Sequence, residues 1–209
     1  GSEMCIRDRY DVNGDPGQRN DISQQKPDVA KRLQAAIDRF KKNVMKGYGQ
    51  DDRPFIIAHP DYRYTQIPAR DGLAHGAIQR SNRWPNCSFF RNWVNVNDTI
   101  TWDAEVGTSG KYRVEIEYAC PEEDVGSTIQ LSFNNSKLKG EITEAHDPPL
   151  RGGENDRHLR GESYVKDFKT MELGVIDLKK GKGTLMLSAL EKPGHQVMEF
   201  RLLMLTRVE

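Results

Sequence analysis

The chain has 209 residues, 36% of them hydrophobic and 30% charged, and its 31 Lys and Arg residues balance 31 Asp and Glu residues. A net charge of zero gives no electrostatic case for DNA, RNA or an anionic membrane as the main partner. No apolar run approaches the roughly 20 residues that span a bilayer, so we expect no membrane segment. The length allows one sizeable core and a small appendage.

Residues 1–9 look foreign to the rest of the chain. The run EMCIRDR at positions 3–9 resembles a translated sequencing adapter, a contaminant of metagenomic gene sequences. We therefore expect residues 1–9 to be foreign or disordered and leave them out of the fold. On this interpretation the authentic upstream sequence is missing.

Residues 10–46 predict a short strand, a turn and a helix. Tyr10 opens a strand-like stretch, and the sequence NGDPG at positions 13–17 is a dense turn signal. Pro27 then begins a helix whose apolar stripe consists of Val29, Leu33, Ile37 and Phe40. We expect that stripe to pack on the following domain or to face a missing one.

Residues 10–46 resemble the C-terminal strand, turn and helix of the sulfatase family, in the alkaline-phosphatase-like superfamily. In that family a strand L-Y-D-L is followed by an Asp-Pro turn, a glutamate, an Asn/Asp-Leu pair and a closing helix. Tyr10-Asp11-Val12, Asp15-Pro16 and Asp21-Ile22 stand at the matching positions. The chain departs from the family at Gln18, where the glutamate is usual, and lacks the leading leucine.

The resemblance implies a parent enzyme of the arylsulfatase or N-acetylgalactosamine-6-sulfatase kind, located in the periplasm or outside the cell. Such an enzyme uses calcium and a formylglycine made from a C/S-x-P-x-R motif, and that motif does not occur here. No catalytic residue is therefore carried over, and we expect no metal or cofactor in this chain. The chain alone should be inactive, and its first partner should be the missing upstream catalytic domain.

Residues 47–54 read as a polar linker, and residues 55–209 as a sandwich of about ten strands. The strongest pattern is ITWDAEVGTSGKYRVEIEY at positions 100–118, two runs of strict alternation joined by a turn. It predicts a hairpin with one buried face. The last strand predicts another buried face, formed by Met198, Phe200, Leu202 and Met204. The predicted fold class is mainly β: a jelly-roll-like antiparallel sandwich preceded by one short strand and one helix.

The order of these runs resembles galactose-binding-like and carbohydrate-binding-module sandwiches. The residues that carry the resemblance are Trp102-Asp103, Ser109 to Tyr112, Gly126-Ser127, Leu173-Gly174 and Gly183 to Leu185. It implies an accessory domain, of a kind that often follows the catalytic part of bacterial polysaccharide-degrading sulfatases.

Two loop-rich regions hold the candidate ligand-binding residues. In residues 60–93, exposed aromatic rings can stack on sugars and arginines can pair with sulfate or carboxylate groups; the candidates are Tyr62, Tyr64, Arg83, Trp84 and Trp93. The alternative is that these aromatics cover the sandwich edge or dock the lost domain. In residues 144–163, a long polar insertion, the candidates are His146, Asp147, Arg157 and His158, and the alternative is an ordered structural loop.

The cysteines leave two interpretations open. Cys87 and Cys120 form one disulfide if the protein is exported, or remain buried free thiols. Neither belongs to a zinc motif.

Together the two resemblances imply the non-catalytic C-terminal part of a secreted sulfatase. Its sandwich either supports the catalytic domain or binds a sulfated polysaccharide. The alternatives are a stand-alone carbohydrate-binding module and a purely structural interdomain sandwich.

Overall fold

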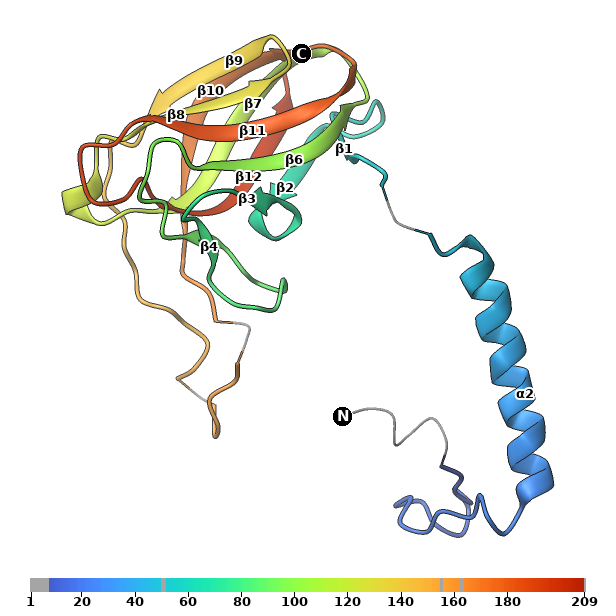
Figure 1. Cartoon of the computed structure of the whole chain (residues 1–209). Helices are drawn as coiled ribbons and strands as arrows, with labels where there is room; N and C mark the ends of the chain where they lie inside the picture. Colours follow the sequence, from blue (N-terminus) through green and yellow to red (C-terminus); the bar gives the residue numbers. More distant parts are fainter. Residues whose placement is uncertain (1–7, 50–51, 155, 162–163, 209) are drawn as a thin grey trace. The chain divides into compact units, whose positions relative to one another are not determined.

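The structure, a computed structural model, describes residues 8–49, 52–154, 156–161 and 164–208 (Figure 1). The chain divides into two compact units, Gly1–Asp52 and Arg53–Glu209. Among the described residues, the first unit holds the α-helix and the second holds every strand.

The helix of the first unit, α2, spans Pro27–Val44 and continues into the 3₁₀ turn η1 at Met45–Gly47. Pro27 begins it, Asp28 lies in its first turn and lysines lie in its last turn, so each charge opposes the helix dipole favourably. The predicted helix is confirmed. None of its residues is buried. Val29, Leu33 and Ile37 of the apolar stripe are half-buried and Phe40 is exposed, so the stripe is only partly covered.

The strand predicted at Tyr10 does not form, because no described strand lies beside it to complete a ladder. A turn begins at Val12 instead, and the Asp11 carbonyl accepts hydrogen bonds from the Gly14 and Asp15 amides at 3.1 and 2.6 Å. Residues 8–26 are thus a series of turns held by carboxylates.

The strands of the second unit form two six-stranded sheets across the described residues. One, sheet A, has the order β1-β6-β11-β8-β9 with β3 beside β6; the other, sheet B, has the order β10-β7-β12-β5-β4 with β2 beside β12. The bounds are β1 Phe55–Ile57, β2 Tyr64–Pro68, β3 Leu73–Ala74, β4 Gln79–Arg80, β5 Phe90–Arg91, β6 Thr99–Val106, β7 Gly110–Ala119, β8 Thr128–Phe133, β9 Ser136–Glu141, β10 Lys169–Leu178, β11 Gly181–Glu191 and β12 Glu199–Arg207. The 3₁₀ turns η2 at Ala69–Asp71 and η3 at Glu122–Asp124 complete the unit. The β1–β6 pair is parallel and the other strand pairs described are antiparallel, so the predicted mainly-β sandwich is present.

The predicted hairpin of residues 100–118 is wrong in its pairing and right in its faces. β6 belongs to sheet A and β7 to sheet B, so the turn between them carries the chain from one layer to the other. Alternate residues of both strands are buried, from Ile100 in β6 to Tyr118 in β7. An alternating pattern indicates which face of a strand is buried. The pattern is the same whether two strands are hydrogen-bonded neighbours or face each other across a core.

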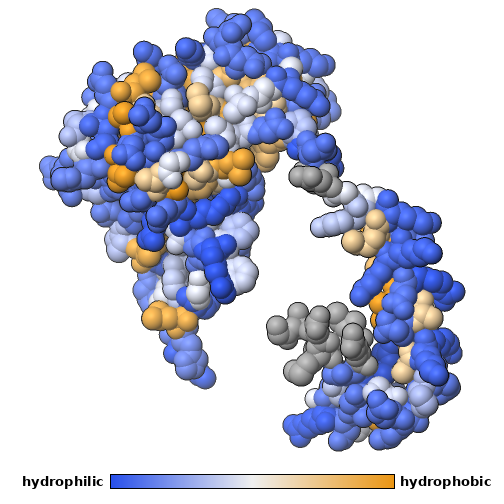
Figure 2. Space-filling view, viewed as in Figure 1, coloured by the Kyte–Doolittle hydropathy of each residue, from blue (hydrophilic) through white to orange (hydrophobic). Residues whose placement is uncertain are grey.

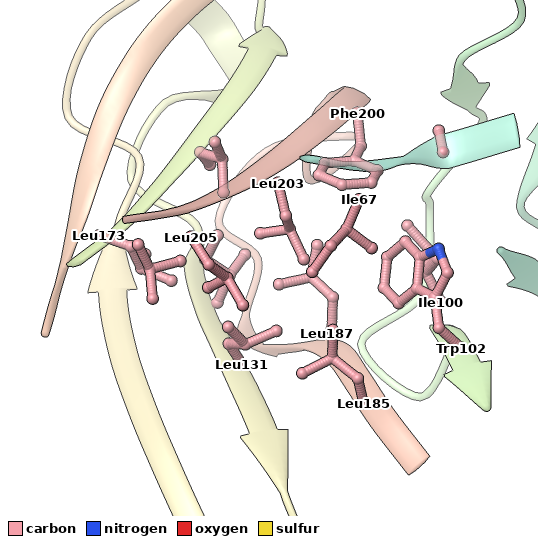
Figure 3. Packing of buried hydrophobic residues seen from close by; sticks show 14 of the residues in the cluster. Ile67, Ile100, Trp102, Leu131, Leu173, Leu185, Leu187, Phe200, Leu203 and Leu205 are labelled. Carbon is pink, nitrogen blue, oxygen red and sulfur yellow. The ribbon is translucent and has the colours of Figure 1, made fainter. Parts of the chain in front are cut away.

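The core lies between the two sheets (Figure 3). Trp102 from β6 meets Phe200 from β12 edge to face, with ring centroids 6.0 Å apart, and its indole nitrogen donates to the Pro68 carbonyl at 3.3 Å. Leu131, Leu185 and Leu187 fill the space from the sheet A side, while Leu203 and Leu205 fill it from sheet B. Burial of this apolar set is the main stabilising term of the unit.

The inward face predicted for the last strand is only half correct. The register of β12 against β7 shifts between Phe200 and Leu202. Such a bulge moves the following side chains to the other face. Phe200 stays in the core, but Leu203 and Leu205 are buried beyond it, while Leu202 and Met204 turn to the outer face.

Candidate functional site

Two long connections meet at one end of the sandwich: residues 81–89, between β4 and β5, and residues 142–168, between β9 and β10 (Figure 1). The rings of Phe89 and Phe168 pack edge to face with centroids 5.2 Å apart. Farther out, the side-chain amide of Asn82 donates to the Gly161 carbonyl. The structure therefore brings together parts of the two candidate regions that the sequence separates.

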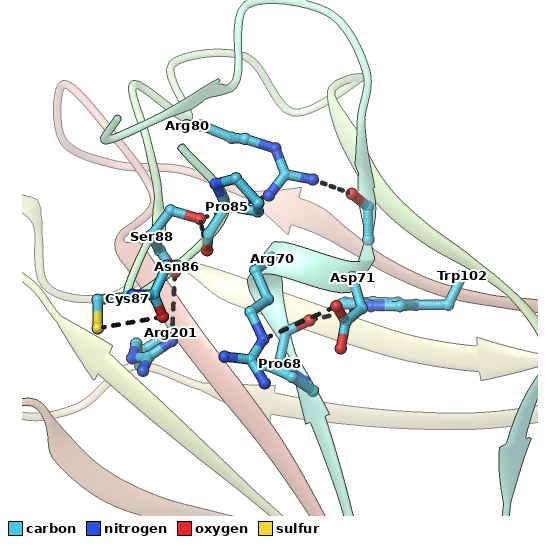
Figure 4. Close-up of polar contacts among 11 residues, drawn as sticks. Pro68, Arg70, Asp71, Arg80, Pro85, Asn86, Cys87, Ser88, Trp102 and Arg201 are labelled. Atoms are coloured by element: carbon cyan, nitrogen blue, oxygen red, sulfur yellow. Dashed lines mark hydrogen bonds and ion pairs between the residues drawn. The ribbon is translucent and has the colours of Figure 1, made fainter. Parts of the chain in front are cut away.

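The β4–β5 connection is fixed to the sheets by arginines (Figure 4). Arg201, at the bulge of β12, donates to the Ser88 carbonyl at 3.2 Å, and Arg80 donates to the Gly72 carbonyl at 3.0 Å. The Ser88 hydroxyl in turn donates to the Pro85 carbonyl at 2.8 Å. Charge-assisted bonds to backbone carbonyls hold a loop in one conformation.

At the tip of this connection, Arg83 lies over the ring of Trp84, with its guanidinium carbon 4.3 Å from the ring centroid. Trp84 is 44% exposed, so its position agrees with the predicted ligand-binding role and does not test it. Trp93 is 1% exposed and belongs to the core cluster. It therefore cannot present a ring to a sugar, and its assignment as a site residue is corrected.

The base of the 142–168 connection is built around Lys166. Its ammonium lies 2.6 Å from the carboxylate of Asp147 and 2.8 Å from that of Glu199 on β12. Burial alone would lower the pKa of Lys166, but hydrogen bonds to the two carboxylates outweigh it and raise the pKa. His146 is fixed nearby, since its backbone bridges Cys120 and its ring bonds the Asp167 carbonyl. The ion triplet therefore ties the loop base to sheet B.

The outer part of the same connection stabilises itself. Arg160 pairs with Asp156 at 2.7 Å and stacks on Tyr164, whose hydroxyl donates to the same carboxylate at 2.9 Å. Both hydrogen bonds lower the pKa of Asp156, and the bond from Arg160 has the larger effect. Arg157 and His158 are exposed there and bond to no described residue. The predicted polar pocket is thus divided, with His146 and Asp147 at the base and the other pair in the outer part.

Beside the loop base lies an open hollow of about 310 Å³, lined by Gln79, Arg91, Asn92, Gln196 and Glu199. Gln79 and Arg91 face each other across the β4–β5 pair, and Asn92 is fixed by donating to the Ala77 carbonyl at 2.7 Å. The side chains of Gln79, Arg91 and Gln196 bond to no described residue. The hollow therefore offers one unpaired guanidinium and two unpaired carboxamides.

None of the five lining residues was a candidate in the sequence. They come from β4, from β5 and the residue after it, from the start of β12 and, for Gln196, from the turn before β12, segments that come together only when sheet B folds. Single polar residues in short strands carry no motif, so only the pairing of β5 with β12 reveals them.

Tyr62 and Tyr64 lie elsewhere. Tyr64 is paired with Thr206 near the end of β12, whereas Phe90 of the β4–β5 hairpin is paired with Phe200 near its start. Six residues of strand separate these positions, about 20 Å at the usual rise. The aromatic residues predicted as one site are therefore distributed over two ends of sheet B and the core.

Cys87 and Cys120 are both free thiols. The disulfide interpretation is thus not what the structure has, and the free-thiol alternative holds, with Cys120 fully buried and Cys87 partly so. Burial, and then the nearby Asp124, raises the pKa of Cys120 to about 11.

Two further features of the described residues bear on function. No group of three or more His, Cys, Asp or Glu side chains is arranged there to hold a metal ion. In the same part of the chain, no helix is both long enough and apolar enough to cross a bilayer.

No model of a protein family matches the chain, and no curated protein matches it. The sulfatase resemblance of residues 10–46 therefore stays a prediction.

Several solved structures are similar to part of the chain. A family 35 carbohydrate-binding module from Clostridium thermocellum aligns at 13% identity over 70% of this chain and 100% of its own length, with a TM-score of 0.47. The C-terminal CBM6 of the laminarinase LamC from Zobellia galactanivorans aligns at 13% identity over 69% of this chain and 99% of its own, with a TM-score of 0.45. A Podospora anserina GH26-CBM35 mannanase aligns at 14% identity over 70% of this chain, with a TM-score of 0.45, and only 28% of that enzyme is covered. Identities and scores this low place no ligand on the chain.

Proposed function

We propose that the sandwich is a non-catalytic carbohydrate-binding module and that the hollow beside Lys166 is its ligand site. The observation that carries the proposal is the lining of that hollow: a guanidinium, three carboxamides and a carboxylate around about 310 Å³. That volume lies at the lower end of the range of small-ligand sites, roughly 300–1,000 Å³. It suits one or two sugar units rather than a large cofactor.

The chemistry of the lining favours a sugar. A sugar ring presents neighbouring hydroxyls that donate and accept at once. Carboxamides do the same, and planar guanidinium and carboxylate groups bind two oxygens side by side. Arg91, unpaired within the described chain, adds a site for a sulfate or carboxylate substituent. A sulfated polysaccharide satisfies both features.

Two of the five lining side chains, those of Glu199 and Asn92, are already oriented, and this supports binding. Glu199 is held by Lys166, and Asn92 by the Ala77 carbonyl. A site whose groups are already oriented loses little conformational entropy when the ligand binds.

The same proposal places the module in a longer protein, as the C-terminal part of a secreted sulfatase. Its support is the signature at residues 10–22. The matching residues Asp15 and Asp21 each accept two backbone amides, at 2.8 to 2.9 Å. Those residues therefore have a structural task, which is what a retained segment of a larger fold would need. An upstream gene sequence without a C/S-x-P-x-R motif would rule out this parent and leave the stand-alone module.

Affinity gel electrophoresis of the full chain tests the binding function. Gels contain chondroitin 6-sulfate, dextran sulfate, laminarin or galactomannan, and we expect retardation by at least one sulfated polymer. The double variant Gln79→Ala/Arg91→Ala should lose at least tenfold in affinity. Lys139→Ala, which removes an exposed cation from β9 in the other sheet, should bind like the unchanged chain.

Two results would contradict the proposal. If the folded chain migrates freely in all four gels, the sandwich has the purely supporting role instead. If Gln79→Ala/Arg91→Ala is retarded as strongly as the unchanged chain, the hollow is not the site.

A further inference from the structure

Two tyrosines are exposed between β1 and the start of β2: Tyr62 in the connection and Tyr64 as the first residue of β2. Tyr62 is 65% exposed and Tyr64 is 61% exposed. Neither hydroxyl bonds to a described residue. Their ring contacts are with polar neighbours: Tyr62 with the His59 ring at 5.0 Å, and Tyr64 with the Arg63 guanidinium at 5.8 Å. A tyrosine ring with an apolar face and a polar hydroxyl is well suited to a binding surface.

The connection is fixed despite being exposed. The guanidinium of Arg207, at the end of β12, donates one hydrogen bond to the His59 carbonyl at 2.7 Å and another to the Pro60 carbonyl at 2.9 Å. The backbone amide of Arg207 donates to the Arg63 carbonyl at 2.9 Å. Across the base, the Ala58 amide donates to the Thr65 hydroxyl at 3.1 Å. The backbone that carries the two rings is therefore anchored to sheet B, so the rings are presented from an ordered platform.

The polar groups around the rings include both donors and acceptors. The Asp61 amide donates to Nδ1 of His59 at 3.2 Å, so Nδ1 is the unprotonated nitrogen and the neutral ring carries its proton on Nε2. That N–H has no described partner and is a free donor. The Asp61 carboxylate, 82% exposed, is an acceptor beside it.

We propose that the 58–64 connection is a second carbohydrate-binding subsite, in which Tyr62 or Tyr64 stacks on a sugar ring while His59 and Asp61 bond its hydroxyls. The class of ligand assigned to this subsite, a carbohydrate, rests on the function proposed above. The subsite lies about 20 Å along β12 from the β4–β5 hairpin. One polysaccharide chain of several units is long enough to occupy both subsites, which raises its affinity without new contacts.

A sugar explains this surface better than a protein does. A stable protein interface buries about 800 Å² on each partner around an apolar centre. Here each ring is bordered by exposed polar groups, Asp61 and Arg63 along the chain and Gln66 on β2. A sugar matches this alternation, because its C–H face covers a ring while its hydroxyls reach the polar groups beside it.

Isothermal titration calorimetry on the full chain tests the inference by counting sites. The probes are disaccharides of chondroitin 6-sulfate and of dextran sulfate, each too short to connect the two subsites. The unchanged chain should bind two per molecule. Tyr62→Leu/Tyr64→Leu keeps apolar bulk but removes the rings, and it should bind one saccharide, in the hollow. Gln79→Ala/Arg91→Ala should also bind one saccharide, at the tyrosines. Affinity for the parent polymer should fall at least tenfold in either variant.

The controls separate stacking from folding. Tyr62→Phe/Tyr64→Phe keeps the ring faces and should still bind two, and Tyr48→Ala removes a 76% exposed tyrosine from the first unit and should change nothing. Thermal unfolding of each variant checks that its fold is intact.

The outcomes also distinguish the two proposals. A count of one in the unchanged chain, abolished by Gln79→Ala/Arg91→Ala alone, overturns the second subsite and leaves the proposed function standing. A count of one abolished only by the tyrosine pair supports the subsite and overturns the assignment of the hollow. Unchanged sugar binding in the tyrosine variant, together with loss of self-association in sedimentation, would assign the surface to a protein contact and overturn the inference.

Discussion

The ammonium of Lys166 lies 2.8 Å from the carboxylate of Glu199, across the boundary between the long 142–168 connection and sheet B. Both side chains are mostly shielded, with 14% and 17% of their surface exposed, whereas Asp147, the second partner, is 47% exposed. The pair that fixes the loop is therefore also the pair that orients one wall of the hollow.

Replacing Lys166 by Met should destabilise the second unit by about 1–3 kcal/mol, because Glu199 would keep its place with no cation beside it. Asp147→Asn is the matched control, since it removes the exposed partner and should cost about 0–1 kcal/mol. Urea unfolding measures both. Equal losses in the two variants would mean that the Lys166–Glu199 contact has no special weight.

Substitution at Gly72 tests the packing around Trp102. An added Cβ would lie 2.8 Å from the indole ring, and the backbone there is extended, with φ of −94°, so the conflict is steric only. Gly72→Ala should cost about 1–3 kcal/mol because the ring or the chain must move. Gly161→Ala meets no atom within 4 Å and should leave the melting temperature unchanged. A Gly72→Ala protein as stable as the parent would show that Trp102 adjusts freely.

The two described cysteines should differ in reactivity. With a pKa of about 11, Cys120 has on the order of 0.1% thiolate at pH 8, and it is buried as well. In a Cys5→Ser background, a disulfide reagent at pH 8 should titrate one thiol, that of Cys87, and reach the second only after denaturation. Rapid modification of two thiols in the folded protein would contradict the burial of Cys120.

The raised pKa of Cys120 also predicts a loss of stability in alkali. The folded state holds the proton longer than the unfolded state does, so the contribution is complete below the ordinary value of 9.0 and is lost as pH rises toward about 11. Cys120→Ala should remove this part of the pH dependence. Unfolding curves of the two proteins between pH 8 and 10.5 measure the difference, and parallel pH profiles would refute the assignment.

The alternation of residues 100–118 predicted correctly which side chains enter the core, yet could not show that β6 and β7 lie in different layers. Burial is a property of each residue and leaves a pattern, whereas pairing depends on partners far along the chain, such as β11 for β6 and β12 for β7. The bulge after Phe200 carries no sequence signal either, so Met204 was placed on the wrong face.

The residues of the candidate site likewise fall into those that the sequence can indicate and those that only the folded structure brings together. Residue type alone points to exposed aromatics such as Trp84, but the same rule also selects Trp93, which is core. The sequence does not indicate the hollow, because Gln79 and Arg91 are ordinary polar residues and the hollow forms only when the β4–β5 pair joins β12.

The last prediction concerns the turns of the first unit. The carboxylate of Asp21 accepts hydrogen bonds from the Arg9 amide at 2.8 Å and the Ser23 amide at 2.9 Å. These bonds lower the pKa of Asp21 below its usual 3.8, and the bond from Arg9 has the larger effect. A lowered pKa means that the folded turn prefers the charged carboxylate, so its stabilisation is complete above pH 3.8 and is lost as pH falls through the lowered value. In an amide-resolved NMR titration, the Arg9 and Ser23 signals should move together below pH 3.8. Asp21→Asn should abolish that movement, and a shared midpoint at or above 3.8 in the unchanged chain would show that the two amides do not hold this carboxylate.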